Sequence, residues 1–151
     1  MFIIAFVIGL VMWFVFNYTR HGKYMYAIGG NEAAAEVSGV NVKKTKIIIY
    51  VTAAALYAIA GFLLGAKAGG ASVNMGQGYE LEAIAACTIG GVSVNGGIGR
   101  ISGVVIGVLV FELLKSSMQF LGIQTNYQYI VQGIVIIVAI ALDIRKYIAK
   151  K

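Results

Sequence analysis

The chain has 151 residues, of which 60% are hydrophobic and only 12% are charged. A soluble domain carries about a quarter charged residues, so this composition argues against a soluble protein and indicates a membrane protein. The net charge of +6 does not indicate nucleic-acid binding, because the basic residues gather in two clusters beside apolar runs.

Five apolar segments are candidates for membrane crossings: Met1–Tyr18, Ile47–Ala66, Leu81–Val94, Ile101–Leu121 and Tyr127–Leu142. A helix of about 20 residues reaches across the roughly 30 Å hydrocarbon core. Leu81–Val94 is shorter and contains Gly90 and Gly91, so a re-entrant element is the alternative there. The sequence predicts an all-α fold, a polytopic transmembrane helix bundle of about five spanning helices. Residues 1–151 are expected to form a single transmembrane domain.

The basic residues predict the orientation of these segments. Five lie in the loop 19–46 and four in the tail: Arg20, Lys23, Lys43, Lys44, Lys46, Arg145, Lys146, Lys150 and Lys151. Because cytoplasmic segments carry the excess of lysine and arginine, both regions are expected in the cytoplasm. Lys67–Glu80 is then outside, and an odd number of crossings must connect it to the tail. This requirement favours Leu81–Val94 as a crossing and puts Arg100 inside.

A short capped helix is predicted in the cytoplasmic loop, at Glu32–Ser38. Asn31 suits the N-cap, Gly39 suits the position after the C-cap, and the alanines between them have the highest helix propensity. Two turns of helix are unstable alone in water, so another surface must brace them. A helix of this kind, with a face of small side chains, is expected where a membrane subunit docks against a separate protein. An ordinary interhelical connector is the alternative.

Two long motifs and the tail resemble one family of transporters. Residues 26–42 read YAIGGNEAAAEVSGVNV, residues 78–87 read GYELEAIAAC, and GGVS, GG, QYI and ALD follow at 90–93, 96–97, 128–130 and 141–143. In this order they resemble permease subunits of ATP-binding-cassette (ABC) importers of the ribose/galactose type, most closely the galactose/methyl-galactoside permeases. The resemblance begins near Arg20 and implies that the chain corresponds to the C-terminal half of such a permease. The family's proline and tryptophan before the last helix are absent, where the chain reads Asn126-Tyr127-Gln128.

The resemblance implies a function and a set of partners. The chain is expected to translocate a monosaccharide across the bacterial cytoplasmic membrane as a subunit without its own ATPase motif. The implied partners are a cytoplasmic ABC ATPase that binds the ATP, an extracytoplasmic sugar-binding protein, a second permease chain in a homodimer, and the lipid bilayer. No metal and no cofactor is expected in this chain. The expected ATPase-coupling helix and its flanks comprise Gly29, Gly30, Asn31, Glu32, Ala33, Ala34, Ala35, Glu36, Val37, Ser38 and Gly39.

Polar and aromatic residues are candidates for the translocation path or for contact with the binding protein. A sugar path needs hydroxyl, amide and aromatic groups, and the family signature also contains acidic residues at its start. The candidates are Gln77, Tyr79, Glu80, Glu82, Asn95, Gln119, Gln128 and Gln132. For the two glutamates the alternative is an interfacial carboxylate that only ends a helix.

Small residues at four-residue spacing predict close helix packing. One row has Gly61, Gly65 and Gly69, and the other has Gly99, Gly103 and Gly107. Packing within the bundle is the favoured interpretation, and a dimer seam or a substrate path is the alternative.

Glu112 supports the main rival to an ATP-driven permease. A carboxylate inside a span is either satisfied locally or functional, and Lys115 lies three residues further along the same helix. An ion pair between them is the favoured interpretation, and proton relay in an ion-gradient-driven secondary transporter is the alternative. A non-transporting membrane assembly subunit is the third hypothesis. Residues 97–103 read GIGRISG and lack the lysine and spacing of a phosphate-binding loop, so the chain is not expected to hydrolyse ATP.

Overall fold

In the computed structural model, which describes residues 2–148, seven helices follow one another and these residues form no strand. They divide into two compact units, which meet in the sequence between Gln77 and Gly78. We call them unit 1 and unit 2. The predicted all-α class is confirmed.

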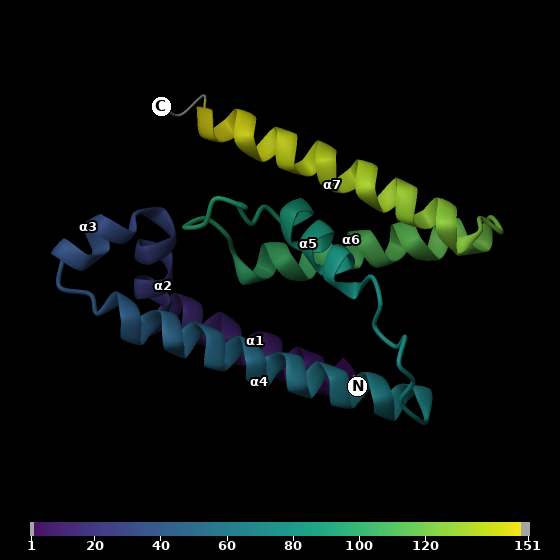
Figure 1. Ribbon diagram of the computed structural model, residues 1–151, viewed down its shortest axis with the longest axis horizontal. Helices are drawn as coiled ribbons and strands as arrows, with labels where there is room; N and C mark the ends of the chain where they lie inside the picture. Colours follow the sequence, from purple (N-terminus) through teal and green to yellow (C-terminus); the bar gives the residue numbers. More distant parts are fainter. Residues whose placement is uncertain (1, 149–151) are drawn as a thin grey trace. The chain divides into compact units, whose positions relative to one another are not determined.

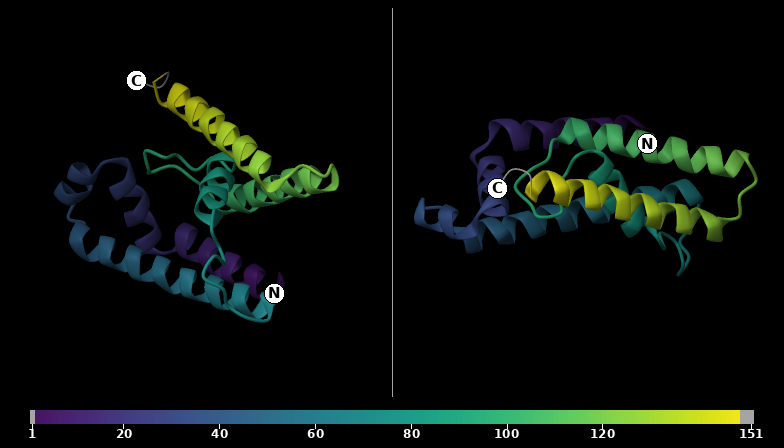
Figure 2. Two further views of the ribbon diagram at one scale, coloured as in Figure 1. Left: turned by 45° about the vertical axis from the view of Figure 1, so that its right-hand side comes forward. Right: turned by 90° about the horizontal axis from the view of Figure 1, so that it is seen from above.

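Unit 1 contains four helices: α1 (Phe2–Tyr18), α2 (Arg20–Gly30), α3 (Glu32–Val37) and α4 (Val42–Ala68). The long helices α1 and α4 run in opposite directions, and α2 and α3 connect them at one end (Figures 1 and 2). Helix α2 contacts α1, α3 and α4, so it forms the centre of this connection.

Helix α2 was not predicted from the sequence, which indicated a loop before the short helix. It begins after a bend of 73° at the end of α1. Thr19 makes the bend with an extended backbone, and its hydroxyl accepts a hydrogen bond from Gly22 N at 3.2 Å. Gly22 lies so close to the backbone of Val15 and Phe16 that a Cβ atom would not fit. A threonine cap and a glycine three residues later were therefore the signals of this helix.

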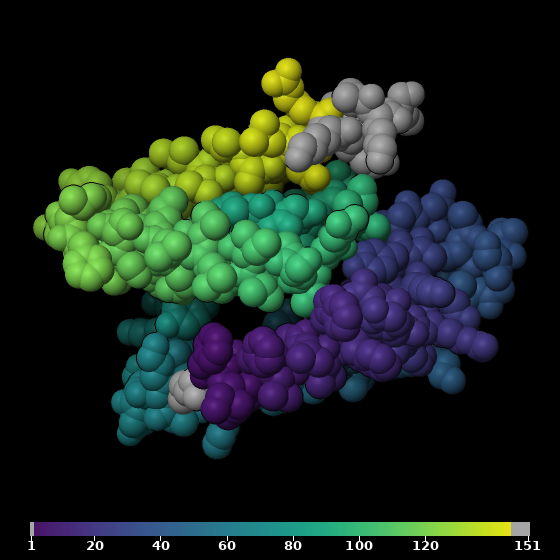
Figure 3. Space-filling view, turned by 180° about the vertical axis from the view of Figure 1, so that it is seen from behind, coloured from purple at the N-terminus to yellow at the C-terminus, as the bar shows by residue number. Residues whose placement is uncertain are grey.

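Unit 2 contains three helices: α5 (Tyr79–Ile89), α6 (Ile101–Phe120) and α7 (Thr125–Ile148). Helix α5 packs against both α6 and α7, and Figure 3 shows it in teal between α6 in green and α7 in yellow. The buried core consists of Ala85, Ala86 and Phe111, with Ile89 and Ile136 packed against it.

Three contacts show how α5 runs between its neighbours. Gly78, just before α5, faces the ring of Tyr129 near the start of α7, and Ser93 bonds to Asp143 near its other end. Gly90, at the end of α5, lies on Gly103 near the start of α6. Helix α5 and the residues after it therefore run parallel to α7 and antiparallel to α6.

The described residues contain fewer candidate spans than the predicted number of about five. Three helices are long and apolar enough to cross a membrane, α4, α6 and α7, and α1 with α2 would make a fourth if this bent pair is one span. The predicted crossing Leu81–Val94 forms only the 11-residue α5, about 16 Å of helix against a hydrocarbon core of about 30 Å. The helix stops because Gly90 caps it and Gly91 has a φ of +81°, which an L side chain rarely adopts.

The end of α5 opens into a non-helical segment, residues 90–100, which we call the break loop. This loop continues along α7 as far as Asp143. Between the end of unit 2 that contains Tyr129 and the end that contains Asp143, the chain is therefore helical over α5 and non-helical over the break loop. Arg100 and the start of α6 lie at the Asp143 end, as the orientation predicted from the basic residues requires. Lys150 and Lys151 of the predicted basic tail lie outside the described residues.

The two glycine rows have different environments. A Cβ atom at Gly103 or Gly107 would overlap backbone atoms of Gly90 or Ala86, so this row is in backbone contact with α5. Such close approach is what small residues permit in membrane helices. The first row is less crowded: a Cβ placed at Gly61 meets no atom of another part of the described chain within 4 Å, and one at Gly65 lies 3.9 Å from the carbonyl oxygen of Gly70, an ordinary contact.

Candidate functional site

Helix α3 is a short helix of unit 1 that is capped at both ends. Asn31 caps its start, where its side-chain oxygen accepts a hydrogen bond from Ala34 N at 3.0 Å. Ser38 follows its last turn, and Gly39 leaves the helix with a φ of +85°. The predicted cap residues therefore lie at the two ends of the helix, which the structure ends at Val37 instead of Ser38.

Two contacts attach α3 to the rest of unit 1. Ala35 is buried, and Lys46 on α4 donates hydrogen bonds to both carboxylate oxygens of Glu32 at 2.7 Å. Both charged side chains are about half exposed, so this pair positions the helix more than it stabilises the fold. The predicted brace for the short helix thus consists of α2 and α4, both of which contact α3.

The face of α3 opposite Ala35 is apolar and uncovered. Ala33, Ala34 and Val37 lie on this face, and all three are exposed. Val37 is 91% exposed, although it is the largest apolar side chain of the helix. Two carboxylates, Glu32 and Glu36, lie beside the face.

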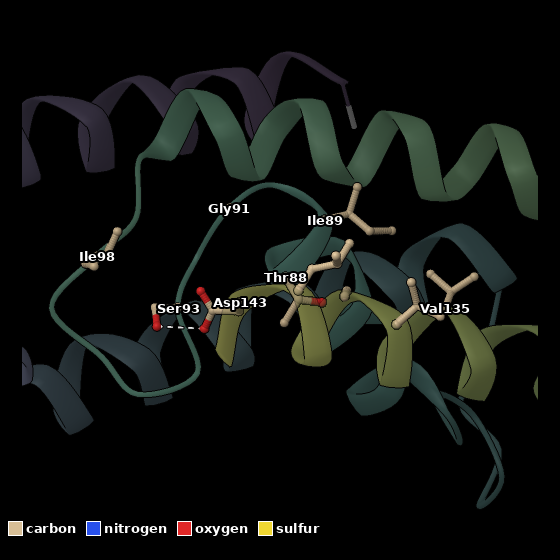
Figure 4. A pocket seen from close by; sticks show the side chains of 10 residues that line it. Thr88, Ile89, Gly91, Ser93, Ile98, Val135 and Asp143 are labelled. Atoms are coloured by element: carbon tan, nitrogen blue, oxygen red, sulfur yellow. Dashed lines mark hydrogen bonds between the residues drawn. The ribbon is translucent and has the colours of Figure 1, made fainter. Parts of the chain in front are cut away.

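A second candidate region is a cavity of about 570 Å³ in unit 2, between the end of α5, the break loop and α7 (Figure 4). Its lining is mostly apolar, with Ile89, Ile98, Val135, Val138, Ala139 and Leu142, and includes Thr88, Gly91, Ser93 and Asp143. The Thr88 hydroxyl donates to carbonyl groups of its own helix. The cavity therefore offers few polar groups to a solute.

Asp143 holds the break loop against α7. Its Oδ2 accepts hydrogen bonds from Ser93 Oγ at 2.8 Å and from Val94 N at 3.2 Å, as the dashed line in Figure 4 shows for Ser93. The Ser93 hydroxyl also accepts a hydrogen bond from Asn95 N at 3.3 Å. One carboxylate thus accepts hydrogen bonds from a hydroxyl and from a backbone N–H of the break loop, donors that have no helical partner of their own.

A third region is the polar cluster where α5 begins. Lys115 on α6 donates to Glu82 Oε1 on α5 at 2.6 Å, and its Nζ lies 5.5 Å from the centre of the Tyr79 ring. The side chains of Lys115 and Glu82 are 22% and 15% exposed. We call Tyr79, Glu82 and Lys115 the α5–α6 cluster.

The predicted ion pair between Glu112 and Lys115 does not form in the described chain. Lys115 turns to Glu82 instead, because the antiparallel packing of α5 on α6 places that carboxylate beside it. Glu112 is exposed, although it lies within the predicted crossing Ile101–Leu121. The sequence could not reveal the pair, since it joins residues 33 positions apart.

The remaining path candidates do not gather in one place. Gln77, Glu80, Asn95 and Gln119 are exposed, and they lie before α5, in α5, in the break loop and in α6. Gln128 and Gln132 are buried in unit 2. Gln128 donates to the carbonyl of Ile123 at 2.9 Å, so it has a structural role at the start of α7. The side-chain oxygen of Gln132 has no partner among the described residues.

Comparisons with known proteins place the chain in a transporter family. A family model described as a branched-chain amino acid transport system permease component matches residues 1–140. The chain belongs to this family, and it is a polytopic membrane protein.

Individual relatives are sugar permeases. The galactose/methyl galactoside import permease of Haemophilus influenzae is 45% identical over 149 residues, which cover 99% of this chain and 44% of the relative. The ribose import permease of Escherichia coli is 44% identical over 140 residues, 93% of this chain and 44% of the relative. The xylose transport system permease of H. influenzae is 46% identical over 137 residues, 91% of this chain and 36% of the relative. The chain therefore spans less than half the length of these relatives. No solved structure matches it significantly.

Proposed function

We propose that this chain is part of the permease subunit of an ABC importer that carries a monosaccharide of the galactose/methyl galactoside or ribose type across the bacterial cytoplasmic membrane. The names of the relatives support the sugar class. The single observation that carries the mechanism is the braced helix α3 with an uncovered apolar face.

In this proposal α3 is the part of the permease that the ATPase moves. A cytoplasmic ABC ATPase binds and hydrolyses ATP and contacts Ala33, Ala34 and Val37. Because Asn31, Ala35 and the Glu32–Lys46 pair fix α3 to α2 and α4, a displacement of α3 is passed to these helices as a rigid-body motion. A sugar-binding protein delivers the solute from outside, and a second permease chain completes the path in a homodimer.

The test is the substitution Ala34→Arg in the complete permease. Arginine adds bulk and a charge that must lose water at a close interface. Co-purification of the ATPase and uptake of radiolabelled sugar are expected to be abolished, while membrane insertion is unchanged. Ala27→Arg, at an exposed position on α2, is the control.

A second variant separates this proposal from its rival. Glu112→Gln removes the carboxylate that a gradient-driven carrier would need, and uptake is expected to be only mildly reduced. If Glu112→Gln stops uptake while Ala34→Arg is tolerated, the chain is a gradient-driven transporter and the ATP-coupled proposal is wrong.

A further inference from the structure

The strongest unexplained feature is a pair of charges inside a predicted membrane span. Helix α6 begins at Ile101, and Lys115 is 14 residues further along the chain. At 1.5 Å per residue, Lys115 lies about 21 Å from the start of a helix that is about 30 Å long. Charged side chains at this depth face the interior of a bundle or a water-filled space, because hydrocarbon solvates them poorly. The Glu82–Lys115 pair must therefore face such a space or be sealed within the bundle.

The exposure of the cluster shows that it is not sealed within unit 2. Both charged side chains retain some accessible surface, and the Tyr79 ring next to them is 48% exposed. The cluster opens onto the surface of unit 2 instead of closing into its core, which consists of Ala85, Ala86 and Phe111.

Helix α6 has three distinct faces around this opening. The buried face, against α5, contains Gly107, Phe111 and Met118. An exposed apolar face contains Ile106, Val110, Leu113 and Phe120. The third face is polar over two turns, with Glu112, Lys115, Ser116 and Gln119 at spacings i, i+3, i+4 and i+7.

The apolar face suits lipid or another apolar helix, and the polar face does not. Four consecutive positions of a helical stripe would each lose solvation in hydrocarbon. The side chains of Glu112 and Gln119 are exposed and have no hydrogen-bond partner among the described residues, so water would solvate them better than hydrocarbon. A polar face of this kind suits an aqueous space at the depth of the α5–α6 cluster.

The chemistry of the cluster fits an uncharged solute rich in hydroxyl groups. Lys115 supplies donors, Glu82 supplies acceptors, and together they carry no net charge. The ring of Tyr79 gives a flat apolar surface beside them, which suits the C–H face of a sugar ring. Few polar groups at fixed positions beside an apolar surface are typical of small-molecule sites.

We propose that Tyr79, Glu82 and Lys115 form a transient binding site for an uncharged monosaccharide on the translocation path, and that Glu112, Ser116 and Gln119 continue the water-lined wall of this path along α6. The inference rests on the proposed function for the identity of the solute. It differs from a purely structural role, in which the ion pair only attaches α5 to α6.

The first arm of the test measures access of water and needs no transport. Ser116→Cys and Gln119→Cys, each in a Cys87→Ala background, are treated with a small charged methanethiosulfonate. Leu113→Cys on the apolar face is the matched control. The two polar-face cysteines are expected to react about tenfold faster or more, because the reaction needs the thiolate, which hydrocarbon disfavours. Equal rates on both faces would overturn the inference.

The second arm measures the solute. Labelling of Ser116→Cys is expected to slow in excess D-galactose, D-ribose or D-xylose. In the reconstituted importer, Tyr79→Leu is expected to raise the apparent KM for uptake about fivefold, the loss of one aromatic contact, while kcat changes little. Leu81→Ala, on the exposed side of α5, is the control and is expected to leave KM unchanged. The binding site is refuted if no sugar slows labelling and Tyr79→Leu leaves KM unchanged.

The two proposals fail in different ways. A wild-type importer that takes up none of these sugars would contradict the proposed function. The labelling rates would still decide whether the polar face of α6 borders water. A structural role for the ion pair is tested by the double variant Glu82→Gln with Lys115→Gln, which leaves no unpaired charge. We expect it to keep the thermal stability of the detergent-solubilised protein within a few degrees while KM rises. A collapse of stability with KM unchanged in the remaining folded fraction would favour the structural role.

Discussion

At the scale of single residues, the smallest side chains set the distance between α5 and α6. Gly103 and Gly107 touch the backbone of Gly90 and Ala86, so the contact between these helices is made by main-chain atoms. Van der Waals packing replaces the hydrophobic effect as the source of helix association in lipid, and it depends steeply on this distance.

Gly103→Leu is expected to separate α5 from α6, because its side chain would overlap Gly90. Inserting side-chain atoms into a packed contact costs about 1–3 kcal/mol, and more where backbone must move. The midpoint of thermal unfolding in detergent should fall accordingly. Gly133→Leu on α7 is the control, since no atom lies within 4 Å of a Cβ there. Equal midpoints for the two variants would contradict the close contact.

Asp143→Ala is expected to release the break loop, because Ser93 and Val94 lose their shared acceptor. Amide hydrogen exchange in residues 93–98 should become about tenfold faster, corresponding to the loss of roughly one hydrogen bond to a charged group. Asp143→Asn keeps an acceptor oxygen at this place and should restore most of the protection. If the alanine variant exchanges like the wild type, the carboxylate does not hold the loop.

At the scale of the helices, the local signals of the sequence were sufficient for α3 but insufficient for α5. Asn31, the alanines and Gly39 are all within one short segment, and together they predicted its bounds to within one residue. The end of α5 depends on Gly90 and Gly91, which the sequence showed as an interruption, although the basic residues favoured a full crossing over Leu81–Val94. Only packing on α6 and the bond from Ser93 to Asp143, 50 positions away, decide where the chain goes next.

Asn31→Ala is expected to weaken α3, because the Ala34 N–H loses its acceptor. Loss of an N-cap costs about 1 kcal/mol, which is large for a helix of two turns. Hydrogen exchange at Ala34 and Ala35 should accelerate, and binding of the ATPase should weaken. Asn31→Asp retains the capping oxygen and should behave like the wild type; a defect as large as that of alanine would exclude capping as the cause.

At the scale of the whole molecule, composition and charge were enough to predict a helical membrane protein. The motifs at residues 26–42 and 78–87 pointed to permeases, as the matched family and relatives are described. The long-range pairs could not be predicted in this way. Lys115 had a nearby carboxylate in the sequence, yet it bonds to Glu82 on another helix. Which carboxylate pairs with Lys115 depends on the direction of α5 relative to α6 and α7, and no local sequence pattern encodes that direction.

The orientation in the membrane can be tested with single cysteines in a Cys87→Ala background. Ala34→Cys and Asn95→Cys are expected to resist a membrane-impermeant thiol reagent in intact cells, because the positions of the basic residues predict that α3 and the break loop are cytoplasmic. Val73→Cys, fully exposed between α4 and α5, is expected to react and is the positive control. Labelling of Ala34→Cys from outside would reverse the orientation of unit 1.

The backbone contact between α5 and α6 also limits how this chain can evolve. The contact between α5 and α6 leaves no space for side-chain atoms at Gly90, Gly103 or Gly107. A methyl group gained at one of these positions would need a smaller residue opposite it. The other two cannot become smaller, because they are already glycine. Ile106, Leu113 and Phe120, on the exposed apolar face of the same helix, carry no such restriction and can exchange among apolar side chains. Substitutions in α6 should therefore accumulate on the exposed apolar face and not at the two glycines. In a homologue, small residues that stay unchanged along α6 should mark the face that contacts α5.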